Sequence, residues 1–150
     1  MLKKFVWLVS IMLVCSFVLT ACAKEPVPAA VDCRAQTTSE AVGSYQVPAP
    51  IDGCYNVAYV YVGPHDDGGW SQSHDVGRLW VEENLEGVHT AYVENVAEGA
   101  DSEQVTRSLA RKGFDVIFTT SFGFMDSSET VANEFPNVDI IHVSGYKANG

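Results

Sequence analysis

Blocks of hydrophobic and polar positions predict a regular succession of strands and helices. Four short apolar runs, rich in β-branched and aromatic residues, predict buried strands at residues 56–63, 88–96, 115–121 and 138–144. Segments with helical periodicity lie between them, at about 71–86, 101–112 and 127–135. Helix-length crossovers between such strands produce a parallel sheet with helices on both faces. The predicted fold class is therefore α/β with a doubly wound parallel sheet.

For two of the predicted helices, the sequence also predicts which residues face the core and, for the second, where it begins and ends. The inward-facing residues of the first are expected to be Val76, Leu79 or Trp80, and Leu85. Those of the second are expected to be Val105, Leu109 and Ala110. We also expect Asp101 to cap the second helix, with Gln104 reaching back to it, and Gly113 to end it.

The first 21 residues have the pattern of an export signal. Lys3 and Lys4 precede an apolar stretch, and the small residues Thr20 and Ala21 precede Cys22. The ending Leu-Thr-Ala-Cys resembles the bacterial lipobox, which implies cleavage before Cys22 and a diacylglycerol on its sulfur. The alternative is an uncleaved anchor, although the apolar run is short of the about 20 residues needed to span a bilayer. Both interpretations place the rest of the chain outside the cytoplasm.

Residues 22–54 are interpreted as a tether and residues 55–150 as the folded domain. The tether is rich in proline, alanine and small polar residues and has no apolar period. Besides Cys22, this segment contains Cys33 and Cys54, which could pair in an oxidising compartment, and two free thiols are the alternative. In the chain-entropy model, closing this loop with a disulfide would stabilise the folded protein by about 3 kcal/mol. No paired Cys or His spacing predicts a zinc site.

The charge of the chain narrows the classes of partner. Two of its nine basic residues, Lys3 and Lys4, lie in the leader, which has no acid. The remainder therefore carries 19 acidic against seven basic residues, a net charge of −12. Nucleic-acid binding requires a basic face that neutralises phosphate, so this class is excluded. A polybasic contact with anionic lipid is excluded for the same reason.

Candidate chemistry gathers in the loops that follow the strands. Ligands of doubly wound sheets bind beyond the carboxyl ends of the strands. These ends lead into residues 64–71, 94–100, 122–126 and 145–147. In the first loop, Trp70 offers a flat ring for stacking, with burial at the helix start as the alternative, and Ser71 offers a hydroxyl. The aspartates of this loop disfavour a phosphate, so a neutral or cationic ligand is expected.

The third loop, residues 121–126, is predicted to form a pocket wall. Phe122 and Phe124 flank a glycine, and Asp126 either accepts hydrogen bonds from ring or amino N–H groups or caps the next helix. Two His-Asp pairs in and after the first loop lack the spacing of a metal site. The chain contains no phosphate-binding glycine motif and no nucleophile constellation, so neither a cofactor nor catalysis is predicted.

A series of motifs follows in a fixed order from residue 56 to the end of the chain. They are Val60-Tyr61-Val62-Gly63-Pro64, Asp67-Gly68-Gly69-Trp70, Tyr92-Val93-Glu94-Asn95-Val96, Glu98-Gly99-Ala100-Asp101, Thr120-Ser121-Phe122-Gly123-Phe124-Met125-Asp126 and Gly145-Tyr146-Lys147. This series resembles the basic membrane protein (Bmp/PnrA-like) family, which are substrate-binding lipoproteins of ABC importers for purine nucleosides or nucleobases. The resemblance implies a type I periplasmic-binding-protein fold, of which this chain would hold the N-terminal lobe.

The resemblance also implies roles and partners. The residues expected to contact ligand are Asp67, Trp70, Ser71, Phe122, Phe124 and Asp126. Many relatives have Phe-Asn where this chain has Trp-Ser, so nucleoside and free base both stay open. The expected partners are an ABC permease and ATPase, with the membrane reached through the lipid on Cys22. The alternatives are an extracytoplasmic sensor for a signalling receptor and a hydrolase.

Overall fold

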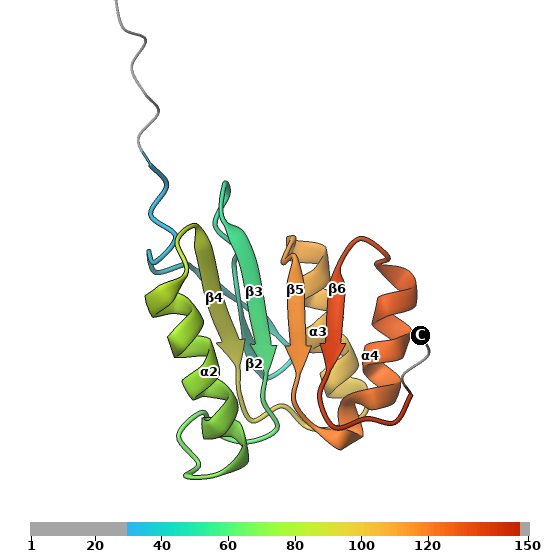
Figure 1. The fold of residues 1–150 in the computed structure, drawn as a ribbon. Helices are drawn as coiled ribbons and strands as arrows, with labels where there is room; N and C mark the ends of the chain where they lie inside the picture. The colour runs from blue at the N-terminus through green and yellow to red at the C-terminus, as the bar shows by residue number, and fades with distance from the viewer. Residues whose placement is uncertain (1–29, 148–150) are drawn as a thin grey trace, which may run out of the picture. The chain divides into compact units, whose positions relative to one another are not determined.

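A computed structural model of the protein describes residues 30–147, in which a parallel sheet forms the centre (Figure 1). Its strands are β3 (Tyr55–Val60), β4 (Val88–Val93), β5 (Val116–Thr119) and β6 (Asp139–His142), in the order β4-β3-β5-β6. All three neighbouring pairs run parallel. The predicted export signal and Cys22 lie outside the described residues. Among the helices of residues 30–147, none is both long and apolar enough to cross a bilayer.

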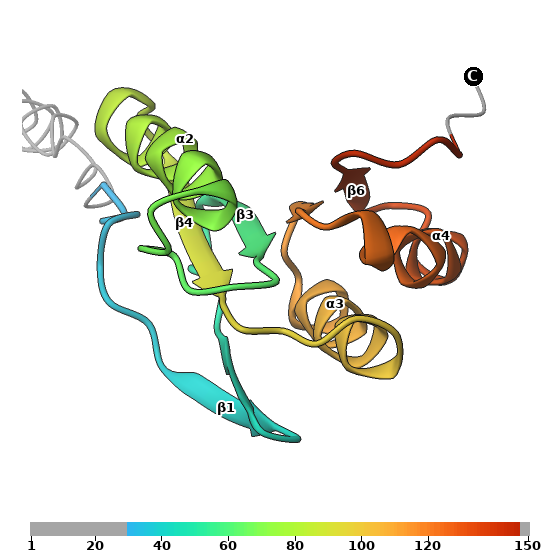
Figure 2. The ribbon, with the colours of Figure 1, turned by 90° about the horizontal axis from the view of Figure 1, so that it is seen from below.

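Helices cover both faces of this sheet, as the doubly wound prediction requires. They are α2 (Trp70–Asn84), α3 (Ala100–Lys112) and α4 (Met125–Glu134). Figure 2 shows α2 on one face and α3 with α4 on the other. Side chains alternate along the central strand, since Ala58 and Val60 belong to the α3 side while Tyr59 and Tyr61 belong to the α2 side. The predicted fold class is confirmed.

Helix α3 buries the face that its sequence predicts, but it begins differently. Val105 and Leu109 are fully buried, and Gly113 ends the helix in the left-handed conformation with φ of 99°. The capping prediction is wrong, because the N-cap residue is Gly99 and no side chain caps the helix. Asp101 lies inside the first turn, where its Oδ2 accepts a hydrogen bond from the Tyr45 hydroxyl at 2.8 Å.

Helix α2 buries a polar face, which contradicts the sequence prediction. Its buried residues are Ser71, Asp75 and Arg78. The predicted inner residues are exposed instead: Val76, Leu79, Trp80 and Leu85. The sheet face beneath α2 explains this, because it offers hydroxyl groups rather than a purely apolar surface. The hydroxyl of Tyr61 donates to Asp75 Oδ1 at 3.1 Å, and Arg78 Nη1 donates to Thr90 Oγ1 at 3.2 Å.

Much of the segment predicted as a tether is folded onto the domain. It contains a hairpin of β1 (Ser39–Val42) and β2 (Tyr45–Pro48), paired antiparallel. Val47 of this hairpin is fully buried in the main core, and Val42 and Tyr45 pack against the same core, so apolar side chains fix this hairpin to the domain. From Val31 onward the chain forms one compact unit with the domain. The tether prediction is therefore wrong for the folded part of residues 31–53.

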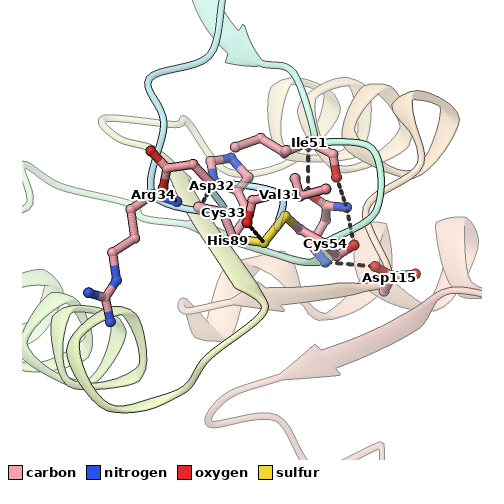
Figure 3. Close-up of a disulfide and its surroundings, with 9 residues drawn as sticks. Val31, Asp32, Cys33, Arg34, Ile51, Cys54, His89 and Asp115 are labelled. Carbon is pink, nitrogen blue, oxygen red and sulfur yellow. Dashed lines mark hydrogen bonds between the residues drawn. A yellow bond between two sulfur atoms is a disulfide. The ribbon is translucent and has the colours of Figure 1, made fainter. Parts of the chain in front are cut away.

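A disulfide between Cys33 and Cys54 fastens the start of this segment to the amino end of β3 (Figure 3). The two Cα atoms are 5.8 Å apart. His89 Nδ1 donates to the Cys33 carbonyl at 3.1 Å, and Arg34 Nη2 donates to the Glu83 carbonyl at 3.1 Å. These contacts lie at the opposite end of the strands from the loops predicted to bind ligand.

Candidate ligand-binding site

Trp70 is the first residue of α2 and lies at the carboxyl edge of the sheet. Its indole Nε1 donates to the Thr120 carbonyl at 2.6 Å, which joins the start of α2 to the end of β5. The side chain is nevertheless 48% exposed, so the alternative of a core residue is wrong within the described part of the chain. The hydrogen bond fixes the edge of the ring and leaves an aromatic surface open to a ligand.

Asp67 and Ser71 build the start of α2 rather than an open surface. The Asp67 carboxylate accepts hydrogen bonds from the backbone N–H groups of Gly69, Ser71 and Gln72 at 2.8, 3.0 and 3.0 Å. These donors, led by Gln72, hold the pKa of Asp67 at about 2. Ser71 is fully buried, and its Oγ accepts from the Gly63 N–H at 3.3 Å. Both side chains therefore already have partners.

The two phenylalanines of the third loop point to different surroundings. A short 3-10 turn, η1 (Phe122–Phe124), follows β5, and the Phe124 N–H donates to the Ser121 carbonyl at 3.0 Å. Phe122 is 57% exposed, whereas Phe124 is fully buried in the main core. The turn directs side chains two positions apart to opposite sides. The expectation that both rings line a pocket is therefore wrong for Phe124.

Asp126 is exposed and pairs with a lysine further along the chain. Its Oδ1 lies 2.7 Å from Lys147 Nζ, which also contacts Glu129 Oε2 at 2.6 Å. Helix α4 begins at Met125, with Phe124 as its N-cap residue and no side-chain cap. The capping alternative for Asp126 is therefore wrong. The 85% exposed carboxylate of Asp126 lies on the side of α4 that faces the end of the described chain.

Residues that sequence reasoning did not single out also lie at this edge. Glu98 comes from the loop after β4, and its Oε1 accepts a hydrogen bond from Ser121 Oγ at 2.7 Å. The ring of Tyr146 is 74% exposed, with its centroid 6.2 Å from that of Phe122. Glu98 and Tyr146 both lie in motifs that resemble the family, but an exposed side chain in a loop has no periodic pattern to reveal it.

The His-Asp pairs have structural partners. His65 binds Glu94 Oε2 through its backbone N–H at 2.7 Å and its ring Nδ1 at 2.9 Å, which ties the first loop to the end of β4. This hydrogen bond raises the pKa of His65. His74 packs edge-on against Trp70, with centroids 4.8 Å apart. Within residues 30–147, no group of three or more ligating side chains could hold a metal ion.

Residues 54–150 match the family model described as ABC transporter substrate-binding protein, PnrA-like (Bmp). The chain belongs to this family. The matched residues include every strand of the parallel sheet and every loop of the candidate site. The hairpin of β1 and β2 and Cys33 precede the matched residues, so the disulfide joins a segment outside the Bmp match to the first residue inside it.

Two curated relatives are similar to this chain over 92 residues, or 61% of its length. One, from Brucella abortus (strain 2308), is 48% identical and is named a purine-binding protein. The other, from Haloferax volcanii, is 40% identical and is named as an ABC transporter glucose-binding protein. The matched region spans 26% and 23% of their respective lengths, about a quarter of each relative.

Two solved structures share the fold of the Bmp domain. A solute-binding protein from Conexibacter woesei DSM 14684 gives a TM-score of 0.54 at 23% identity, covering 58% of this chain and 28% of the other. A solute-binding protein from Aeropyrum pernix K1 gives 0.52 at 24% identity, covering 58% and 24%. Both belong to ABC transporter systems. The doubly wound sheet of this chain is thus a fold that ABC solute-binding proteins contain.

The hydrogen bonds that Asp67 accepts at the start of α2 predict a loss of stability in acid. Its pKa is lowered from 3.8 to about 2 in the folded protein, so its contribution is present above the ordinary pKa and is lost as the pH falls toward the folded value. Asp67→Ala is expected to lower the melting temperature at pH 5. The difference from wild type should shrink between pH 4 and pH 2, as thermal melts across this range would measure. Asp66, the exposed neighbour of Asp67, provides the control. If Asp66→Ala produced the same dependence of melting temperature on pH, the role of Asp67 at the start of α2 would be contradicted.

Proposed function

We propose that the protein is the substrate-binding component of an ABC importer and that the carboxyl edge of its sheet forms part of a site for a purine base or nucleoside. The observation that carries this proposal is the indole of Trp70, which is fixed by Thr120 and still about half exposed. The exposed ring of Phe122 lies two residues beyond Thr120. Stacking on aromatic side chains contributes about 1–3 kcal/mol per base.

The charge around these rings favours a ligand without phosphate. Glu98 and Asp126 lie on the loop and helix that flank Phe122, and the chain beyond the leader has a net charge of −12. Such a field repels a phosphate group and tolerates a neutral heterocycle. The name of the Brucella relative supports a purine, while the name of the Haloferax relative makes glucose the competing ligand.

The same proposal includes the place of the protein in the cell. Cys22 would carry the lipid that holds the binding domain outside the cytoplasmic membrane, and an ABC permease and ATPase would receive the ligand. The disulfide between Cys33 and Cys54 supports an extracytoplasmic location, because such bonds persist in oxidising compartments. Binding and release require no chemistry at the ligand, so we propose no catalytic activity and no cofactor.

Titration calorimetry on the full-length protein tests the ligand class. The panel would contain adenine, guanine, their nucleosides, the corresponding monophosphates and glucose. We expect micromolar or tighter binding of at least one base or nucleoside and weaker binding of its monophosphate. Binding of glucose with no response to any purine would overturn the proposal. Chemical conversion of a bound purine during incubation would overturn the non-catalytic role.

The stacking role of Trp70 gives a prediction with a matched control. Trp70→Ala is expected to weaken purine binding by about 1–3 kcal/mol through loss of the stacked ring. Trp80→Ala removes the same side chain from the same helix, at a position that is 58% exposed and nearly three turns away. Calorimetry should show unchanged affinity for this control. Equal losses from the two variants would contradict a contact between Trp70 and the ligand.

A further inference from the structure

Glu98 is an acidic side chain at the carboxyl edge that has no ionic partner among the described residues. Its Oε1 accepts one hydrogen bond, from Ser121 Oγ at 2.7 Å. None of the ion pairs formed within residues 30–147 includes Glu98. A carboxylate has about four acceptor positions on its two oxygens, so Glu98 keeps most of its capacity for another donor.

The two carboxylates that the sequence suggests for ligand binding have less capacity left. Asp67 accepts three backbone N–H groups at the start of α2. Asp126 contacts the ammonium group of Lys147 at 2.7 Å. A ligand that used either carboxylate would have to compete with these partners. Glu98 requires no such exchange.

Glu98 is held next to the residues that position the two exposed aromatic rings. Thr120 accepts the indole N–H of Trp70, Ser121 donates to Glu98, and Phe122 presents its exposed ring. These three residues are consecutive, and neighbouring Cα atoms are 3.8 Å apart. The stretch after β5 therefore brings two aromatic surfaces and one open carboxylate to the same edge.

Gly123 provides the space in which the Glu98 carboxylate lies. A Cβ atom added at Gly123 would overlap the Cδ and both carboxylate oxygens of Glu98. Gly123 has no positive φ, so its backbone does not itself require glycine. The missing side chain at this position thus serves the placement of Glu98. Gly123→Ala should displace the end of this flexible side chain while keeping its charge.

We propose that Glu98 accepts a hydrogen bond from the exocyclic amino group of the bound purine, and so selects aminopurines; this rests on the purine site proposed above. An ionised carboxylate only accepts hydrogen bonds, and bonds to it are shorter and stronger than those between neutral groups. The amino group of a purine ring stacked against Trp70 or Phe122 could donate such a hydrogen bond to Glu98. A purine without that group would leave the open oxygen of Glu98 without a partner.

Calorimetry on the full-length protein tests this with two ligands that differ in one group. The ligands are the aminopurine that binds best, adenine or guanine, and unsubstituted purine. Glu98→Gln is expected to weaken binding of the aminopurine at least about 10-fold, because hydrogen bonds to a charged acceptor are roughly twice as strong as those to a neutral one. Binding of unsubstituted purine should change less than about 3-fold. Gly123→Ala should reproduce the same selective loss with the charge retained.

Two further variants separate the explanations. Asp66→Asn removes one charge from another exposed position at the same edge and should leave both affinities within about 3-fold, which controls for the overall field. Asp126→Asn tests the competing carboxylate, and a selective loss there with none in Glu98→Gln would overturn the proposal. Equal weakening of both ligands in Glu98→Gln would also overturn it. Wild-type protein that binds no purine would overturn the purine site itself, whereas wild-type binding with unchanged Glu98→Gln affinities would overturn only the role of Glu98.

Discussion

Replacing Phe124 with alanine is expected to destabilise the protein by about 3–5 kcal/mol, the usual cost of removing a large aromatic side chain from a core. Phe124 is fully buried, in one cluster with Leu109, Ile117 and Val131. It therefore joins α3, β5 and α4 in the main core. The change would leave a cavity among these elements, because close-packed neighbours relax only partly into the space.

Its neighbour in the same turn provides the control. Phe122→Ala removes an identical side chain that is 57% exposed, so its effect on stability should be small. Denaturant unfolding of the two variants would measure the contrast. In calorimetry with a purine, Phe122→Ala should weaken binding more than Phe124→Ala does, since Phe122 presents its ring at the candidate site. Equal loss of stability from the two changes would show that Phe124 is not the core residue of the pair.

Arg78→Met is expected to cost about 3–5 kcal/mol of stability, because it leaves a buried carboxylate without its cation. Arg78 and Asp75 are 8% and 4% exposed, and Arg78 Nε lies 2.5 Å from Asp75 Oδ1. The guanidinium also contacts Glu82 Oε2 at 2.8 Å and lies 4.9 Å from the centroid of the Tyr92 ring. Without Arg78, Asp75 would keep the hydrogen bond from the Tyr61 hydroxyl but lose its cation.

A second arginine network, on the other side of the sheet, is more exposed and serves for comparison. Arg107 contacts Glu103 at 2.6 Å and Glu134 at 2.7 Å, but the side chains of these partners are 36% and 41% exposed, against 6% for that of Asp75. Arg107→Met should therefore cause a far smaller loss, since water solvates the carboxylates that remain. Adding Asp75→Leu to Arg78→Met should recover part of the lost stability, because it removes the uncompensated charge. Denaturant unfolding that ranks Arg78→Met no worse than Arg107→Met would contradict a buried ion pair.

Helix α2 shows why periodicity alone misassigned a buried face. Apolar residues at Val76, Leu79 and Trp80 have helical spacing and formed the most hydrophobic side of this helix. The sequence contains no sign that the sheet beneath would present Tyr61 and Thr90, whose hydroxyls bond to Asp75 and Arg78. Which side of a helix is buried depends on the surface against which it packs, and here that surface is formed by strands elsewhere in the chain.

The candidate site illustrates the same division. Trp70 and Phe122 could be chosen from the sequence because they are aromatic residues close to the predicted carboxyl ends of parallel strands, where ligands of doubly wound sheets bind. Glu98 could not, since its placement depends on Ser121 and Gly123, which lie 23 and 25 positions later. The sequence predicts that Phe124 lines the pocket together with Phe122, because the spacing of the two residues does not show that a 3-10 turn places one in the core and the other at the surface.

The sequence by itself determined the parallel α/β sheet, the order of its elements, the buried face and glycine end of α3, and the edge of the sheet at which the candidate site residues lie. These features depend on local periodicity and on the direction in which strands run. Only the tertiary structure decided that α2 buries its charged face, that the hairpin around Val47 belongs to the core, and that Glu98 keeps an open carboxylate. Each of these depends on a partner far away in the chain, and no local pattern specifies which polar groups will meet after folding.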